Sequence, residues 1–242
     1  MKAAIFGDIH GNAAALRAVF DDMDRIGVDY AVCTGDIAFR GPAPLESLSL
    51  LLERGCDGFV VGNTDQWLYQ GFPEGFSPPP ERLEQLRTFR EWALERLGAS
   101  DLATLRSFAF SHRFSLGPHT VLVVHSSPKS TEDWYDAASS DQELLPLFEG
   151  AGACDILVYG HIHTPFVRRI HRRWLMNTGS VGNPVDGDYR ASYLLLEADR
   201  NGLHVQIRRV AYDVDETARL AAERGFPLAE AYAQALRTGH GL

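Results

Sequence analysis

Short apolar runs alternate with longer stretches of helical periodicity in the N-terminal part of the chain. Residues 3–6, 28–33 and 58–61 predict buried strands, and the apolar side chains between these runs return at helical spacing. Gly27 follows the first helical stretch and is a typical helix stop. This order of strand, helix, strand, helix and strand predicts parallel pairing in an α/β fold.

The middle of the chain departs from this order. Prolines at 78–80 interrupt the chain, and the apolar residues that follow have helical spacing without an intervening strand. We therefore expect a helical insertion at about residues 66–110. Residues 121–124 and 156–159 predict two further buried strands, with a short helix near residues 143–148 between them.

The C-terminal part, at about residues 191–242, predicts a hairpin followed by helices. Residues 192–196 and 203–207 have strand character and are joined by the turn sequence Asp199-Arg200-Asn201-Gly202. A helical pattern then closes the chain. Since no linker divides the sequence, we expect a single domain over residues 1–242.

The composition of the chain indicates which kinds of partner it can bind and in which compartment it works. Lys and Arg number 23 against 32 Asp and Glu, a net charge of −9, which argues against a broad surface for duplex nucleic acid. The 3 cysteines are far apart in sequence, which predicts buried thiols in a reducing compartment. There is no signal peptide and no long apolar segment, so we expect a cytoplasmic protein without a membrane partner.

Polar side chains follow the predicted strands at the point where each strand ends. They are Asp8, His10, Asp36, Asn63, His125, His161 and His163. Ligands bind at the carboxyl ends of strands in open α/β sheets, so we expect these side chains at one edge. Oxygen and imidazole ligands without thiolate suit manganese, iron, zinc or a similar divalent ion. The set is too large for one ion of ordinary coordination number, and two ions that share a carboxylate fit better.

These motifs, in this order, resemble the calcineurin-like metallophosphoesterases. The resemblance covers roughly residues 1–196 and rests on Asp8-Ile9-His10-Gly11-Asn12, Gly35-Asp36 with Arg40-Gly41, Gly62-Asn63-Thr64-Asp65, Val124-His125 and Gly160-His161-Ile162-His163. The segment 177–184 is similar to the small bacterial and archaeal phosphodiesterase branch. The resemblance implies a four-layer α/β/β/α sandwich of two mixed β-sheets flanked by helices.

Carried over motif by motif, the resemblance implies a role for each ligand. One metal would be held by Asp8, His10 and His163. The other would be held by Asn63, His125 and His161. Asp36 would bridge the two ions and serve as the catalytic residue. The expected cofactors are two divalent ions, with Mn²⁺ favoured and Fe, Zn, Ni or Co as alternatives.

Three further residues bear on the substrate. Arg40 stands at the spacing at which the protein-phosphatase branch has a phosphate-binding arginine, and a surface arginine in a turn is the alternative. Asn12 is a candidate for helix capping, for phosphate contact, or for both. Thr64 replaces a histidine that protonates the leaving oxygen in many members. Asp65 or a metal-bound water would then be the source of that proton.

The leading prediction is a dinuclear metal-dependent phosphoesterase that hydrolyses phosphodiester bonds of small substrates with a metal-bridging hydroxide. A phosphomonoesterase for nucleotides or phosphoproteins is the alternative, and Arg40 favours it. A non-catalytic metal-binding scaffold belongs to a different class of function. It is disfavoured because all the ligand positions are filled.

Overall fold

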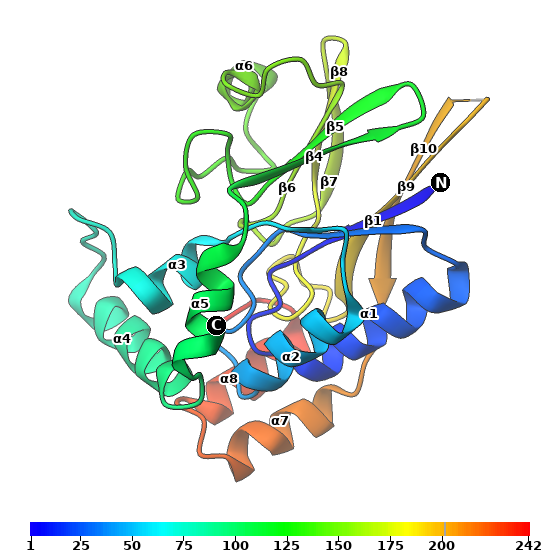
Figure 1. Cartoon of the computed structure of the whole chain (residues 1–242). Helices are drawn as coiled ribbons and strands as arrows, with labels where there is room; N and C mark the ends of the chain where they lie inside the picture. Colours follow the sequence, from blue (N-terminus) through cyan, green and yellow to red (C-terminus); the bar gives the residue numbers. More distant parts are fainter. Residues whose placement is uncertain (201) are drawn as a thin grey trace.

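The structure is a computed structural model that describes residues 1–200 and 202–242. Two five-stranded sheets face each other in it, and each carries helices on its outer side (Figure 1). Each sheet contains both parallel and antiparallel pairs. The predicted sandwich of two mixed sheets flanked by helices is therefore confirmed.

The first sheet has the order β10-β9-β1-β2-β3. Its strands are β1 (Lys2–Phe6), β2 (Tyr30–Cys33), β3 (Gly58–Phe59), β9 (Ala191–Asp199) and β10 (Gly202–Val210). β1, β2 and β3 pair in parallel as predicted, and β9 and β10 form the predicted antiparallel hairpin. β3 is shorter than predicted, and Val60 forms an isolated parallel bridge to Ala109. The predicted turn includes Asn201, which lies outside the described residues.

The second sheet has the order β4-β5-β6-β8-β7. Its strands are β4 (Ser111–Leu116), β5 (His119–Val124), β6 (Ile156–Tyr159), β7 (Phe166–Ile170) and β8 (Arg173–Asn177). β5 and β6 are the two strands that the apolar runs predict. β4 and β7 lie at the edges of the sheet, where alternate residues face solvent, so a continuous apolar run is absent.

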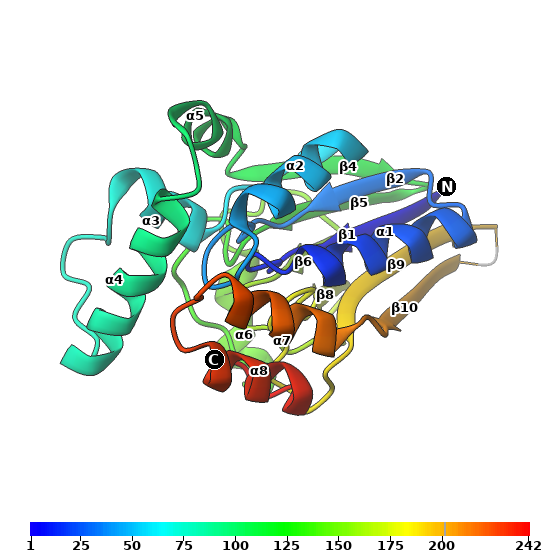
Figure 2. The ribbon, with the colours of Figure 1, turned by 90° about the horizontal axis from the view of Figure 1, so that it is seen from below.

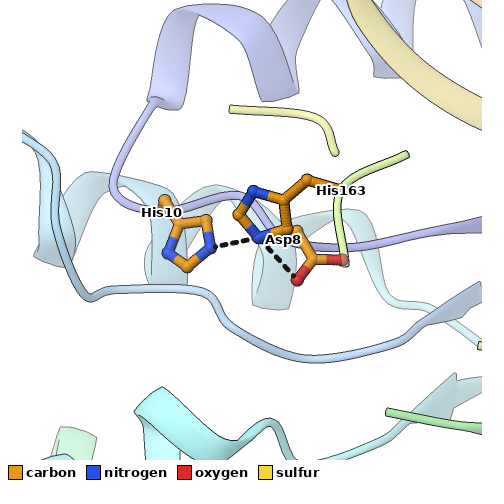
Figure 3. A group of neighbouring side chains, drawn as sticks. All are labelled: Asp8, His10 and His163. Carbon is orange, nitrogen blue, oxygen red and sulfur yellow. Dashed lines mark hydrogen bonds and ion pairs between the residues drawn. The ribbon is translucent and has the colours of Figure 1, made fainter. Parts of the chain in front are cut away.

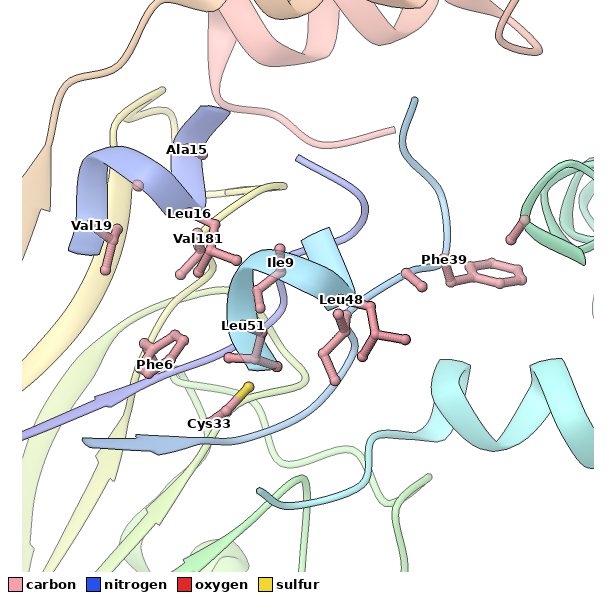
Figure 4. Packing of buried hydrophobic residues seen from close by; sticks show 14 of the residues in the cluster. Phe6, Ile9, Ala15, Leu16, Val19, Cys33, Phe39, Leu48, Leu51 and Val181 are labelled. Carbon is pink, nitrogen blue, oxygen red and sulfur yellow. The ribbon is translucent and has the colours of Figure 1, made fainter. Parts of the chain in front are cut away.

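Successive residues of the central strands point into different layers of the core. In β1, Ala3 and Ile5 pack between the two sheets, whereas Ala4 and Phe6 pack against the helices. Figure 4 shows the helix side of this core, with Phe6 near Leu16. Both faces of these strands are buried, which explains why their sequences are apolar without alternation.

Helices cover the outer sides of both sheets. α1 (Ala13–Ile26), α2 (Pro44–Arg54), α7 (Val214–Glu223) and α8 (Ala229–Thr238) cover the first sheet (Figures 1 and 2). α6 (Asp141–Leu144) and the 3₁₀ helix η1 (Leu145–Phe148) pack on the second. α1 ends at Gly27, which has a left-handed φ of 68°, as its sequence predicts. Within residues 1–200 and 202–242, no helix is long and apolar enough to cross a membrane.

Three helices occupy the segment in which the sequence predicts an insertion. They are α3 (Asn63–Gln70), α4 (Pro80–Leu94) and α5 (Ala99–Ser107), and they lie to one side of the layers (Figures 1 and 2). α4 begins at the last residue of the proline run and packs Phe89 on Phe226, with ring centroids 5.5 Å apart. α3 begins directly at a predicted metal ligand, so this segment forms part of the site. That the chain forms one domain stays a prediction.

Candidate metal centre

The predicted ligands lie together at the carboxyl ends of β1, β2, β3, β5 and β6. All of them are buried except His161, which is partly exposed. Each of them has a side-chain contact to at least one other member of the set. The strand order of the two sheets therefore brings to one place residues that lie far apart in the sequence.

One group consists of Asp8, His10 and His163 (Figure 3). Nε2 of His10 lies 3.0 Å from Nε2 of His163, and the latter atom lies 3.3 Å from Oδ1 of Asp8. Nε2 of His10 also lies 3.7 Å from Oδ2 of Asp36. These atoms surround a single point that a cation could occupy.

The second group gathers around His125. Its Nε2 atom lies 2.9 Å from Oδ1 of Asn63 and 3.2 Å from Nδ1 of His161. The same Nε2 atom is 3.6 Å from Oδ1 of Asp36. The two oxygens of Asp36 thus face the two groups, which is the position that a bridging carboxylate requires.

Main-chain carbonyl groups fix the protonation of three imidazole rings. The Nδ1 atoms of His10, His125 and His163 lie 3.0, 2.8 and 2.6 Å from the carbonyl oxygens of Phe39, Thr34 and Asn183. Because a carbonyl oxygen can only accept, each Nδ1 carries the hydrogen and donates it. In the neutral ring, each Nε2 atom then presents a lone pair to the centre.

The atoms that face one another in the centre are therefore acceptors without a hydrogen between them. The two Nε2 atoms of His10 and His163 are such a pair, and so are Nε2 of His125 and Oδ1 of Asn63. Asn63 turns Oδ1 inward because its Nδ2 donates to Oε2 of Glu132 at 3.2 Å. Two ligands about 2.1 Å from one ion and at right angles are about 3.0 Å apart. The donor set thus fits divalent cations.

Backbone strain is concentrated at the same residues. Among the described non-glycine residues, eight have a positive φ. Six of these eight belong to the predicted site, namely Asp8, His10, Asp36, Arg40, His161 and His163. Such conformations cost about 1–3 kcal/mol each and cluster at functional sites. The strain indicates that the loops hold these side chains in place at the expense of stability.

The electrostatics of the centre favour the ligating protonation state at Asp8 and His161 but not at Asp36 and His125. Burial raises the pKa of Asp36. Burial lowers the pKa of His125, but the charges of Asp36 and Asp8 outweigh it and raise that pKa. Burial raises the pKa of Asp8, but the imidazoles of His163, His125 and His10 outweigh it and lower that pKa to about 2. Burial lowers the pKa of His161 to about 3. A charged carboxylate and a neutral imidazole are the ligating forms of these groups.

Two acidic residues support the ligands. Glu132 accepts from Nδ2 of Asn63 and, at 2.7 Å, from Nε1 of Trp67, which orients the Asn63 amide. Asp65 accepts from the main-chain N–H groups of Asp36, Ile37 and Gly62 at 2.8–3.0 Å. Its carboxylate is buried among these groups outside the cavity lining, and burial together with the charge of Asp36 raises its pKa to about 7. Asp65 as the proton donor stays a prediction.

A cavity of about 630 Å³ opens over the metal-ligand groups. Arg40 and Thr64 line it together with several of the ligands. The Nε atom of Arg40 is buried and has no hydrogen-bond partner among the described residues. Burial, with the charge of Arg82, lowers the pKa of Arg40 to about 10, so the guanidinium remains charged at neutral pH.

Asn12 lies outside the lining of this cavity. Its Oδ1 accepts from the N–H of Ala15 at 3.1 Å and caps α1. Its Nδ2 donates to the carbonyl oxygen of Gly182 at 3.2 Å and to Oη of Tyr212 at 3.1 Å. Of the two predicted roles of Asn12, the structure shows capping, and the phosphate contact stays a prediction.

Some residues of the site carried no signal in the sequence. Glu132 belongs to no ligand motif and lies in the loop after β5, yet it holds the Asn63 amide. His240 matched no metal motif and received no role, and it lines the cavity. A carboxylate in a polar loop and a histidine near a helix end have many alternative roles, so their sequence context could not have identified them.

Comparisons with known proteins agree with this geometry. A model of the calcineurin-like phosphoesterase superfamily domain matches residues 1–201. An uncharacterised protein of Methanocaldococcus jannaschii is 27% identical to this chain, and the match covers 93% of each protein.

Two solved structures share the whole architecture. The crystal structure of a metallophosphoesterase from Sphaerobacter thermophilus is 28% identical with a TM-score of 0.77, over 99% of each chain. The crystal structure of a hypothetical protein from Pyrococcus horikoshii has a TM-score of 0.83 at 18% identity. The match covers 100% of this chain and 99% of the other, and at this identity the similarity shows the fold alone. Because the family model matches residues 1–201, which include the buried Asp and His groups of the centre, the chain belongs to the calcineurin-like phosphoesterase superfamily.

Proposed function

We propose that the chain is a dinuclear metal-dependent phosphoesterase that hydrolyses phosphodiester bonds in small substrates. The observation that carries the proposal is the pair of acceptor groups on either side of Asp36. Neutral imidazoles with their lone pairs turned toward each other repel unless a cation lies between them. This arrangement supports two cation sites that share one carboxylate.

The contacts suggest which side chains would hold each ion. One site would use Asp8, His10 and His163. The other would use Asn63, His125 and His161, and Asp36 would serve both. Nitrogen and oxygen donors without thiolate favour Mn²⁺, with Fe, Zn, Ni or Co as alternatives. Two bound ions of this kind lower the pKa of a shared water and polarise the phosphoryl oxygens of the substrate.

The residues of the cavity would bind the substrate and set its class. Nε of Arg40 has no hydrogen-bond partner among the described residues, and a guanidinium group matches phosphoryl oxygens. Thr64 places a small side chain where an imidazole would otherwise protonate the leaving group. Its Oγ1 atom has no partner among the described residues, and its main-chain N–H donates to Oδ1 of Asp36 at 2.9 Å. This arrangement favours esters with good leaving groups. The similarity of residues 177–184 to the phosphodiesterase branch of the family supports a diester as the substrate.

Hydrolysis of two aryl substrates after metal removal and reloading tests the proposal. We expect the protein to hydrolyse bis(4-nitrophenyl) phosphate with added Mn²⁺ and to lose this activity in EDTA. A panel of Fe²⁺, Zn²⁺, Ni²⁺ and Co²⁺ then identifies the most effective ion. If the protein binds metal but hydrolyses neither this diester nor 4-nitrophenyl phosphate with any ion, the scaffold alternative replaces the proposal.

A phosphomonoesterase is the second candidate, because Arg40 has an unpartnered charge beside the centre. A monoester carries one more negative charge than a diester. Arg40→Ala should therefore lower kcat/KM for 4-nitrophenyl phosphate by about 10-fold to 100-fold, the value of a charge-assisted hydrogen bond, and lower it less for the diester. Arg172→Ala, an exposed arginine outside the cavity, is the matched control. Equal losses on both substrates would leave Arg40 without a role in choosing between them.

A further inference from the structure

A second cationic side chain faces the cavity from the helical segment. Arg82 lies in the first turn of α4 and lines the same cavity as Arg40 and the metal ligands. Pro78, which precedes α4, and Leu86, which lies one helical turn after Arg82, line the cavity as well. The N-terminal end of α4 therefore borders the site, and a helix N-terminus favours anions.

Neither arginine is paired with an Asp or Glu side chain in the described part of the chain. Among the ion pairs of residues 1–200 and 202–242, none includes Arg40 or Arg82. Arg82 donates to the side chain of Gln85 and lies 3.5 Å from the main-chain oxygen of Leu242, the limit of a hydrogen bond. Nε of Arg40 is buried without a partner.

Among the described residues, no acidic side chain of the cavity wall forms an ion pair with either arginine. Glu132 is engaged by Asn63 and Trp67, and Oδ1 of Asp136 accepts from the N–H of Ala138 at 2.7 Å. Arg40 and Arg82 line the same cavity, and burial together with the charge of Arg82 lowers the pKa of Arg40. Two guanidinium groups without an Asp or Glu ion-pair partner in one partly buried cavity favour a ligand that supplies negative charge.

The position of Arg40 connects the two regions of the cavity. Asp36 and Asp8 raise its pKa while Arg82 lowers it, so Arg40 is within electrostatic range of both the metal ligands and Arg82. Trp67, Phe76 and Leu86 add apolar wall to the same cavity. This surface suits the organic part of a small molecule that joins two polar groups.

We propose that the substrate carries a second anionic group, a phosphate or a carboxylate, that binds between Arg40 and Arg82. The inference rests on the proposed function, because the phosphoester itself would occupy the metal centre. Guanidinium groups bind such anions with paired hydrogen bonds in a fixed geometry. The substrate class is thus a small phosphoester with an additional phosphate or carboxylate.

Two diesters with the same leaving group test this inference. Methyl 4-nitrophenyl phosphate carries one charge, and 2-phosphonoethyl 4-nitrophenyl phosphate adds a second anionic group. We expect the wild-type protein to prefer the second substrate in kcat/KM. Arg82→Gln should lower kcat/KM for that substrate by about tenfold or more, while the methyl ester changes less than about twofold. Replacing the phosphonate by a carboxylate distinguishes the two kinds of anion.

Arg87→Gln is the matched control, because Arg87 is an exposed arginine of the same helix outside the cavity. This variant should leave kcat/KM unchanged for both substrates. No preference in the wild type, or equal losses on both substrates in Arg82→Gln, would overturn the inference. If neither substrate is hydrolysed, the proposed function fails, and calorimetric titration of the metal-loaded protein decides the inference. 3-Phosphonopropionate should then bind the wild type at least about tenfold more tightly than Arg82→Gln, and equal affinities would overturn it.

Discussion

Thr64 is the residue at which this site differs most from the family pattern. It lines the cavity between the ligand Asn63 and the buried Asp65. The carboxylate of Asp65 accepts three main-chain hydrogen bonds and is not among the residues that line the cavity. A site without the histidine of the family pattern should depend strongly on the leaving group.

Thr64→His should weaken that dependence. General acid catalysis contributes about 10²–10⁴ in rate, and its contribution grows as the leaving oxygen becomes more basic. The measurement is kcat/KM against leaving-group pKa for wild type and variant, with metal analysis to confirm that the Asn63 ligand still binds. A shallow slope in the wild type that is unchanged in a metal-replete variant would show that another acid, such as Glu132 in the cavity wall, already supplies the proton.

At this scale the sequence predicted the residues that gather at the candidate metal centre, and it missed the residues that support them. Asp36 and His125 come directly after apolar strands, so the strand ends and the family motifs identify them together. Glu132 contacts Asn63 across 69 residues of sequence, and no local pattern marks such a contact. The positive φ of Asp8 or His163 depends on the surrounding structure and is equally invisible in the sequence.

The loop that follows β8 supports the loop that follows β1. The N–H of Gly182 donates to the carbonyl oxygen of Asp8 at 3.0 Å. A Cβ atom at Gly182 would lie 1.8 Å from the carbonyl oxygen of Ile9, which no alanine can accommodate without a shift of the main chain. The position of Asp8 and His10 therefore depends on a glycine far away in the sequence.

Gly182→Ala should displace this loop and weaken metal binding. We expect a loss of about 1–3 kcal/mol in the free energy of unfolding, as for overpacking of a core, together with lower metal affinity in calorimetric titration. Gly55→Ala is the control, because Gly55 also adopts an unusual conformation, with a φ of 66°, but has no atoms within 4 Å of the added Cβ. Unchanged metal affinity in Gly182→Ala would contradict the role of this loop.

Elements were predictable where burial is complete on both faces. β1, β5 and β6 read as apolar runs because they lie in the middle of their sheets. β7 and β8 contain three arginines, and their pairing depends on a hairpin at the sheet edge. Arg173 packs its guanidinium group over the ring of Phe148, with Cζ 4.1 Å from the ring centroid. Such a contact between distant side chains cannot be inferred from periodicity.

On the scale of the whole molecule, Asp22 connects α1 with the C-terminal hairpin. Its carboxylate accepts from Oη of Tyr193 at 2.7 Å and from Nε of Arg208 at 3.0 Å. Burial raises the pKa of Asp22, but the hydrogen bonds from Tyr193, Arg208 and Arg25 outweigh it and lower the pKa below its usual value of 3.8. The charged form is thus bound more tightly in the folded state.

Asp22→Asn should destabilise the fold in a pH-dependent way. A lowered pKa adds stability that is present above the usual value of 3.8 and is lost as the pH falls through the folded pKa. Chemical unfolding at pH 7 should show the variant to be less stable by about 3 kcal/mol, and the difference should shrink below pH 3.8. The control Asp21→Asn removes the same charge from an exposed position and should have little effect. A difference that does not change with pH would contradict this account.

The packing of two sheets could not be predicted from the apolar pattern. Ile5 belongs to the core between the sheets and Phe6 to the core under the helices, yet both are simply apolar residues in one run. The pattern shows that both faces are buried but leaves open what covers them. The four-layer arrangement came from the family motifs, because the order of the strands is set by contacts between residues distant in sequence.

Metal stoichiometry of the wild type and of Asp36→Asn tests the central claim most directly. We expect elemental analysis and calorimetric titration to show two divalent ions per chain in the wild type. Asp36→Asn should weaken both sites together, whereas His10→Ala and Asn63→Ala, which touch one group each, should each weaken one. At most one ion per metal-saturated wild-type chain, or loss of a single site in Asp36→Asn, would contradict the account.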